Sequence, residues 1–104
     1  DILFLSNGEK VKSSLDVGDF ILDVSSDNLI CGIEIMDASE NLGIAKEFLN
    51  QVQNIKMSVN YKTNNVLVLL MMTFKREGQI VNIPIPLTLD LGHKVPKTDI
   101  LVYN

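Results

Sequence analysis

The run from Phe20 to Ser39 (FILDVSSDNLICGIEIMDAS) constrains the fold more than any other part of this sequence. Apolar and polar positions alternate from Phe20 to Val24, and this period of two predicts a strand with one buried face. The Ser, Asp and Asn residues at positions 25–28 favour a turn. Alternation resumes from Leu29 to Met36. The run therefore predicts a β-hairpin.

A helix is expected directly after this hairpin. Asp37 and Glu40 have the spacing of a capping box. Apolar residues then recur at helical intervals from Ala38 to about Val52, which is typical of an amphipathic helix. We therefore expect one main helix that packs on the sheet.

Further strands are predicted on both sides of this unit. Asn7 and Gly8 form a strong hairpin signal, so the strands before and after them are expected to pair. Pro84 and Pro86 lack a donor on the same side, which predicts an edge strand. The further strands are expected at Ile2–Leu5, Lys10–Ser14, Ile55–Tyr61, Val66–Phe74, Val81–Leu89 and Ile100–Tyr103. The predicted fold is α+β, an antiparallel β-sheet of about six or seven strands with one main α-helix packed on a face.

The strand Val66–Phe74 is apolar at almost every position. Such a strand is typical of a central position with both faces covered, one by the helix and the other by a loop or another subunit. We therefore take alternate residues of this strand as candidates for an interface with another subunit. These candidates are Val68, Leu70, Met72 and Phe74.

Length and composition bound the remaining possibilities. A chain of 104 residues with 46% hydrophobic composition predicts a single domain, residues 1–104. Its one cysteine, Cys31, favours a reducing compartment, and the cytoplasm is the expected location. The longest apolar run is far shorter than a membrane span requires, so no membrane association is expected. The chain opens with Asp1 rather than a basic signal-peptide region, and we expect further residues to precede it.

Charge is distributed unevenly along the chain. The net charge of −4 argues against nonspecific binding of nucleic acid. Residues 1–52 carry a net charge of −7 and residues 53–104 a net charge of +3. Such asymmetry can orient head-to-tail self-association or attract a basic partner. The alternative is a solvated acidic face with no partner.

The sequence offers little catalytic equipment. Cys31 and His93 are the only residues of their types, so an ordinary zinc site cannot be built within one chain. We therefore predict no enzyme and no cofactor. The acidic residues are the remaining candidates, either for calcium or, in an enzyme, for acid-base chemistry by Asp23 and Glu34, which can lie across the hairpin from one another. The metal candidates are Asp23, Asp27, Glu34 and Asp37.

The first part of the chain, from Asp1 to Ser39, resembles the YuzE-like family of domain of unknown function 2283. The similarity lies in the segments LDVGDFILD (15–23) and GIEIMDAS (32–39), separated by an acidic turn. The strands after Val52 extend beyond the usual short domain. The resemblance implies no catalytic activity. Because some relatives are found beside small toxin-like proteins, it implies that an antitoxin-like neutraliser of a small basic toxin is one possible function.

Four functions therefore remain open. The first is a noncatalytic interaction module that forms a homo-oligomer or binds a small protein partner. The second is a calcium-binding protein that uses the acidic cluster, and the third is the antitoxin-like neutraliser. The fourth is a hydrolase or similar enzyme that uses the carboxylates of Asp23 and Glu34.

Overall fold

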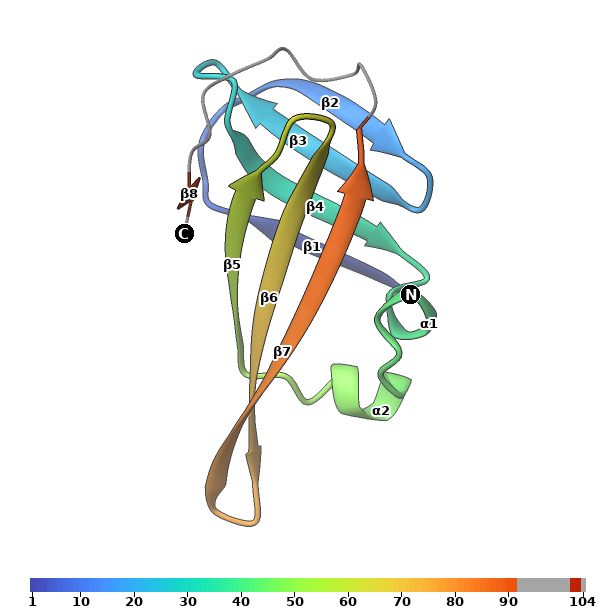
Figure 1. Cartoon of the computed structure of the whole chain (residues 1–104). Helices are drawn as coiled ribbons and strands as arrows, with labels where there is room; N and C mark the ends of the chain where they lie inside the picture. The colour runs from blue at the N-terminus through green and yellow to red at the C-terminus, as the bar shows by residue number, and fades with distance from the viewer. Residues whose placement is uncertain (92–101, 104) are drawn as a thin grey trace.

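The alternation of apolar and polar side chains leads to two antiparallel β-sheets, which the computed structural model describes for residues 1–91 and 102–103 (Figure 1). The first, here the N-sheet, has the strand order β1-β4-β3-β2, and the second, here the C-sheet, has the order β7-β6-β5-β8. The N-sheet strands are β1 (Ile2–Ser6), β2 (Val11–Val17), β3 (Phe20–Ser25) and β4 (Ile30–Met36). The C-sheet strands are β5 (Asn54–Tyr61), β6 (Asn65–Arg76), β7 (Gln79–Asp90) and β8 (Val102–Tyr103).

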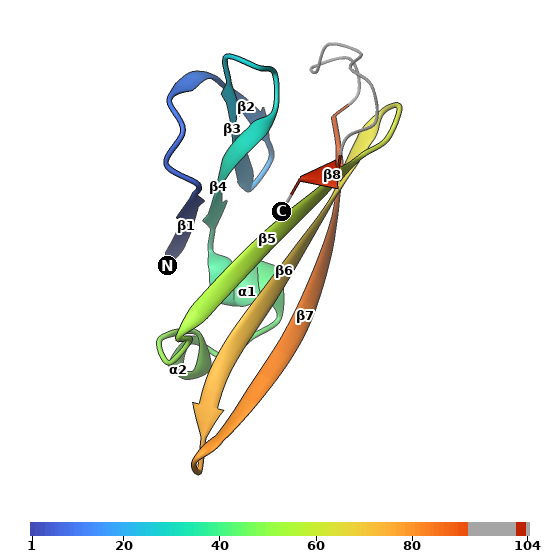
Figure 2. The same ribbon diagram turned by 90° about the vertical axis from the view of Figure 1, so that its left-hand side faces the viewer.

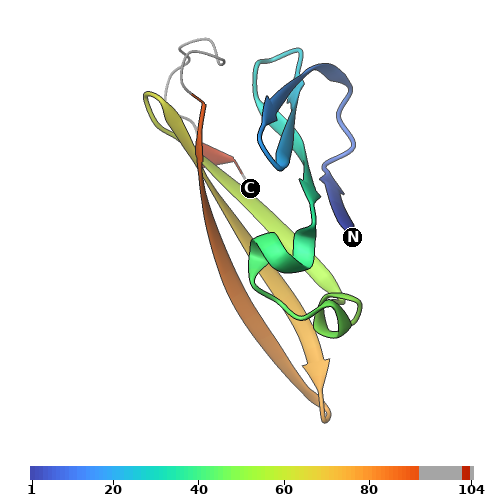
Figure 3. The same ribbon diagram turned by 90° about the vertical axis from the view of Figure 1, so that its right-hand side faces the viewer.

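The two sheets pack face to face, and their strands cross at a large angle (Figure 1). Figures 2 and 3 show the sheets edge-on as two layers. The inner faces supply one continuous core of buried side chains. Its fully buried members include Leu22, Ile33, Ile35, Val59, Val68 and Leu70. The outer face of each sheet therefore points away from the other sheet.

The predicted fold class is wrong in its helical part. No main helix covers a sheet; among the described residues the helical segments are α1 (Ala38–Leu42) and α2 (Lys46–Leu49), which link the sheets at one end of the sandwich (Figure 3). Gly43 ends α1 because it adopts a left-handed conformation with φ of 67°. The molecule is mostly β, with two sheets in place of one.

The expected capping box at the start of α1 is also wrong. Asp37 does occupy the N-cap position, but its backbone is left-handed and its side chain makes no capping hydrogen bond. The carboxylate of Asp1 takes that role, accepting a hydrogen bond of 3.0 Å from the backbone N–H of Ser39. The backbone oxygen of Asp1 accepts another from Ala38 N–H, at 3.1 Å. Asp1 therefore fixes the first turn of α1 through two hydrogen bonds.

The predicted hairpin at Asn7 and Gly8 does not form. β1 pairs with β4 along its whole length, and β2 pairs with β3. A tight two-residue hairpin of the favoured type needs positive φ at both central residues, whereas only Gly8 of this pair has it. The chain instead crosses from one edge of the N-sheet to the other between β1 and β2.

Other strand predictions are confirmed. The β3-β4 hairpin forms, β6 lies between β5 and β7, and β7 is the edge strand that Pro84 and Pro86 predicted. β7 keeps a continuous register with β6 through both prolines, so their nitrogens face the open edge. The predicted last strand is present as β8, which pairs with β5. His93 lies outside the described residues.

A β-bulge in β4 creates a cross-sheet contact. Asp23 pairs with Gly32 and Val24 pairs with Ile30, which leaves Cys31 as the extra residue. Ile30 lies beyond the end of β1, and its backbone N–H donates instead to the hydroxyl of Tyr61 in the other sheet, with 2.5 Å between the two atoms. This buried hydrogen bond ties the N-sheet to the C-sheet.

Candidate interaction surface

The acidic residues proposed as metal ligands are spread along the N-sheet. Asp23 pairs with Gly32, whereas Glu34 pairs with Ile21, so the two carboxylates are diagonal rather than direct neighbours. Asp27 lies in the β3-β4 turn and Asp37 at the opposite end of β4. Within residues 1–91, no three His, Cys, Asp or Glu side chains come together in a group that could hold a metal ion. The predicted acidic cluster is thus not assembled.

Cys31 is a buried thiol. Burial raises its pKa above the ordinary value of 9.0, and the nearby carboxylates of Asp23 and Glu9 raise it further. Its Sγ lies 3.5 Å from the backbone oxygen of Asp23. Because a reactive cysteine needs exposure and a lowered pKa, this environment is that of a structural thiol.

The outer face of the C-sheet carries exposed apolar side chains along the middle of β6. Leu67 and Leu69 of β6 are 38% and 37% exposed, and Met71 follows them on the same face. In the register of the sheet, Leu69 lies beside Pro86 and Met71 beside Pro84. These five residues are called the apolar stripe below. The stripe follows the inner strand β6 and extends onto the edge strand β7.

Two shallow hollows lie along the apolar stripe. One, of about 310 Å³, is lined by Leu67, Leu69, Pro86 and their neighbours, and the other, of about 390 Å³, by Leu69, Met71 and Lys56. Both have predominantly carbon walls, to which Ser58 contributes a polar group. Lys56 of β5 is exposed, and it borders the stripe opposite Met71. Such a surface suits contact with another apolar surface that carries negative charge.

The outer face of the N-sheet combines apolar and acidic side chains. Ile2 and Phe4 of β1 are 63% and 59% exposed. Across the sheet, Phe4 lies beside Glu34, which pairs in turn with Ile21. Asp16 and Asp23 occupy the same face on β2 and β3. This mixed surface is called the acidic face below.

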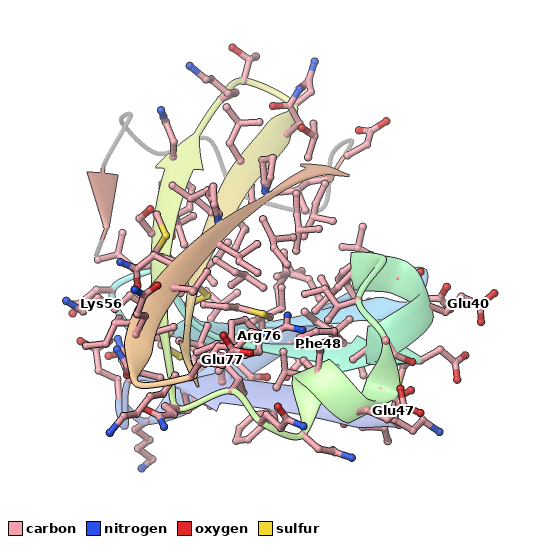
Figure 4. The ribbon with its side chains drawn as sticks, turned by 90° about the horizontal axis from the view of Figure 1, so that it is seen from below. Glu40, Glu47, Phe48, Lys56, Arg76 and Glu77 are labelled. Atoms are coloured by element: carbon pink, nitrogen blue, oxygen red, sulfur yellow. The ribbon has the colours of Figure 1, made fainter. Side chains whose placement is uncertain are left out.

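The β6-β7 hairpin projects beyond the sandwich (Figure 2). Near its turn, the ring of Phe48 from α2 meets Phe74 edge-on with 6.4 Å between centroids, and the Arg76 guanidinium lies over Phe48 at 4.9 Å. Figure 4 shows Arg76 beside Phe48, with Lys56 on the opposite side of the molecule from Glu47. These contacts brace the projecting hairpin against the helical segment.

The residues predicted for a subunit interface are placed in the core. Val68, Leu70, Met72 and Phe74 all point between the sheets and are at most 5% exposed. The exposed side chains of the same strand are the intervening ones of the apolar stripe. An almost wholly apolar strand contains no alternation from which its inner and outer faces could be told apart. Identifying the faces required the neighbouring strands: Lys56 and Ser58 on β5 and the prolines on β7 share the outer face.

Comparison with known proteins shows a relative of this chain. A protein of Methanosarcina mazei, named "Putative hypoxanthine phosphoribosyltransferase", is 30% identical to this chain over 81 residues. The match covers 78% of this chain and 66% of the relative, so the chain spans slightly less than two thirds of that protein. No protein-family model matches the chain, and no solved structure matches it. None of the described helices has the length and apolar character needed to cross a bilayer.

Proposed function

We propose that this chain is a noncatalytic protein-interaction module whose docking surface is the apolar stripe. The observation that carries the proposal is the exposure of Leu67 and Leu69 on the central strand of a sheet, with Met71 and two prolines beside them. Contiguous apolar surface of this kind is uncommon on a protein that acts alone and is typical of a binding surface. Its burial by a partner is favourable by roughly 25 cal/mol for each Å² removed from water.

The geometry favours a partner that lies on the face of the C-sheet. One edge of that sheet is β7, where Pro84 and Pro86 remove two donors that an added strand would need. The shallow hollows on the face offer carbon contacts and few hydrogen-bonding groups. A small polar metabolite would find few partners there, whereas a protein surface with projecting apolar side chains would fit.

Site-specific photocrosslinking tests this function. A photoreactive phenylalanine analogue is placed at Leu69 in the full chain, expressed in its own host, and irradiated. The matched control carries the analogue at Ile83, which is 38% exposed but lies on the opposite face of the same sheet. We expect a defined protein adduct from position 69 and none of that size from position 83. Equal labelling at the two positions, or none at either, would refute the docking surface.

A second candidate function rests on the relative from Methanosarcina mazei, whose name is that of an enzyme. Phosphoribosyl transfer to hypoxanthine would need groups that bind a diphosphate and its metal ion. Among the described residues, no three His, Cys, Asp or Glu side chains form a group that could hold a metal ion, and the described helices are of five and four residues. Incubation with hypoxanthine, phosphoribosyl diphosphate and Mg²⁺ tests this candidate directly. Formation of inosine monophosphate above a blank would replace the noncatalytic proposal.

A further inference from the structure

The structure points to a specific occupant of the apolar stripe: we infer that it is the acidic face of a second copy of this chain. The inference rests on the proposed function and names its partner. The stripe belongs to the C-sheet and the acidic face to the N-sheet, so each copy carries both halves of the contact. The association is therefore head to tail.

Charge is the first argument for this pairing. On the outer face of the C-sheet, Lys56 of β5 borders the stripe and Lys75 of β6 lies beyond it toward the hairpin turn, while Asp90 lies at the far end of β7. The acidic face presents Asp16, Asp23 and Glu34. Two copies of the stripe placed together would bring lysines toward lysines, whereas the stripe against the acidic face brings lysines toward carboxylates. Opposite electrostatic potentials raise both the affinity and the rate of encounter, and they therefore favour contact between the stripe and the acidic face.

Apolar complementarity is the second argument. The acidic face is not uniformly polar, because Ile2 and Phe4 are among the most exposed large apolar side chains of the described chain. They lie on the outer face of β1, next to Met36 and Glu34 of β4. Sheets stack at about 10 Å when their facing side chains interdigitate. The hollows of about 310 and 390 Å³ beside Leu69 have room for the ring of Phe4.

The arrangement of the layers sets the form of the assembly. The outer faces of the two sheets point in roughly opposite directions, as both edge-on views show (Figures 2 and 3). A contact between two different faces leaves one stripe and one acidic face free on every pair. Such a heterologous contact continues until it closes into a ring or forms an open row.

Two single substitutions separate this arrangement from the alternatives. Leu69→Glu blocks the stripe and leaves the acidic face intact, and Phe4→Lys blocks the acidic face and leaves the stripe intact. Each variant alone should be a monomer of 11.6 kDa by light scattering after gel filtration. Mixed in equal amounts, the two should form a dimer of twice that mass and nothing larger, because only one complementary contact remains.

The controls are matched for exposure. Ile83→Glu places the same charge on the opposite face of the C-sheet, and Val11→Lys places a lysine on β2 at a residue that is 44% exposed. Both should keep the concentration-dependent mass of the wild-type chain. Circular dichroism confirms that each variant is folded. If Leu69→Glu or Phe4→Lys fails to fold, Lys56→Glu and Glu34→Lys serve as the pair, and each should again be monomeric alone and dimeric in the mixture.

Every other outcome overturns the inference. A wild-type chain that stays monomeric at all concentrations excludes self-association, although a photocrosslink from position 69 to a different protein would still support the interaction module. Phe4→Lys protein that oligomerises while Leu69→Glu protein does not indicates that two stripes pair with each other. A mixture that remains monomeric shows that the two faces do not bind one another.

Discussion

The hydrogen bond between the two sheets gives the sharpest prediction about stability. Tyr61→Phe removes only the hydroxyl oxygen that accepts from Ile30 N–H, and both residues are buried. The tyrosine ring stays in place, so little apolar packing is lost. The amide of Ile30 would remain buried without its acceptor, because β1 ends before it reaches this position.

A buried donor left without a partner costs about 1–3 kcal/mol. Taking about 2 kcal/mol as the central value, the midpoint of thermal unfolding should fall by about 8–16 °C for a chain of this size. Urea titration followed by circular dichroism measures the free energy of unfolding directly. Amide hydrogen exchange should show faster exchange at Ile30 than at its neighbours in β4.

Thr73→Val is the matched control for Tyr61→Phe. It also deletes one hydroxyl from a hydrogen bond, the 2.8 Å bond to Asn82, but that bond is exposed to solvent. We expect it to change the free energy of unfolding by less than about 0.5 kcal/mol. If Tyr61→Phe is no more destabilising than Thr73→Val, the cross-sheet bond does not hold the sheets together and the reasoning fails.

Three further predictions concern the N-sheet and α1. Gly32→Ala should destabilise the chain by about 1–3 kcal/mol, because the added Cβ would lie 2.9 Å from the backbone oxygen of Leu5; an unchanged urea midpoint would contradict this close approach. Asp1→Ala should cost about 1 kcal/mol through loss of the hydrogen bond to Ser39 N–H, and equal stability of the two proteins would show that this cap is not needed. The pKa of Cys31 is raised in the folded chain, so the thiol of the unfolded chain ionises at lower pH. The contribution of Cys31 to the free energy of unfolding should therefore be complete below pH 9.0 and should decline as the pH rises above that value. Cys31→Ala should remove this alkaline decline in urea titrations, and a decline of the same size in both proteins would assign it to other groups.

Strands were the part of the fold that the sequence predicted well. Alternation in β3 and β5 and the turn residues between β3 and β4 are local signals, and local signals decide where a strand begins and ends. The prolines of β7 placed it at an edge for an equally local reason, since they remove donors.

Pairing and helix length depended on features that a local pattern does not contain. Gly43 divides the apolar pattern of 38–52 into two short helices because it takes a left-handed conformation, which a count of apolar spacing ignores. β1 pairs with β4, although the two strands are far apart in the sequence. Gly32 permits this pairing because it has no side chain to collide with the backbone oxygen of Leu5. The separation into two sheets also follows from such distant contacts.

The residues predicted for an interface on β6 lie on its buried face. The sequence pointed to β6 because it is apolar throughout, yet Val68 and Leu70 face the core while Leu67 and Leu69 face solvent. A shift of one residue exchanges the faces of a strand, so only the register with β5 and β7 could decide between them. The spacing of the acidic candidates also depends on the fold, since Asp27 and Asp37 lie at opposite ends of β4.

The two prolines of β7 also oppose one kind of polymer, the kind that grows by adding strands to this edge. Growth by adding strands to β7 would require amide donors at Pro84 and Pro86, so this edge does not act as a template for amyloid-like extension. Copies joined through their faces leave the hydrogen bonds of every sheet within one molecule. Such a row should dissolve on dilution and bind no thioflavin T, and replacing both prolines by threonine should make the protein prone to irreversible fibres.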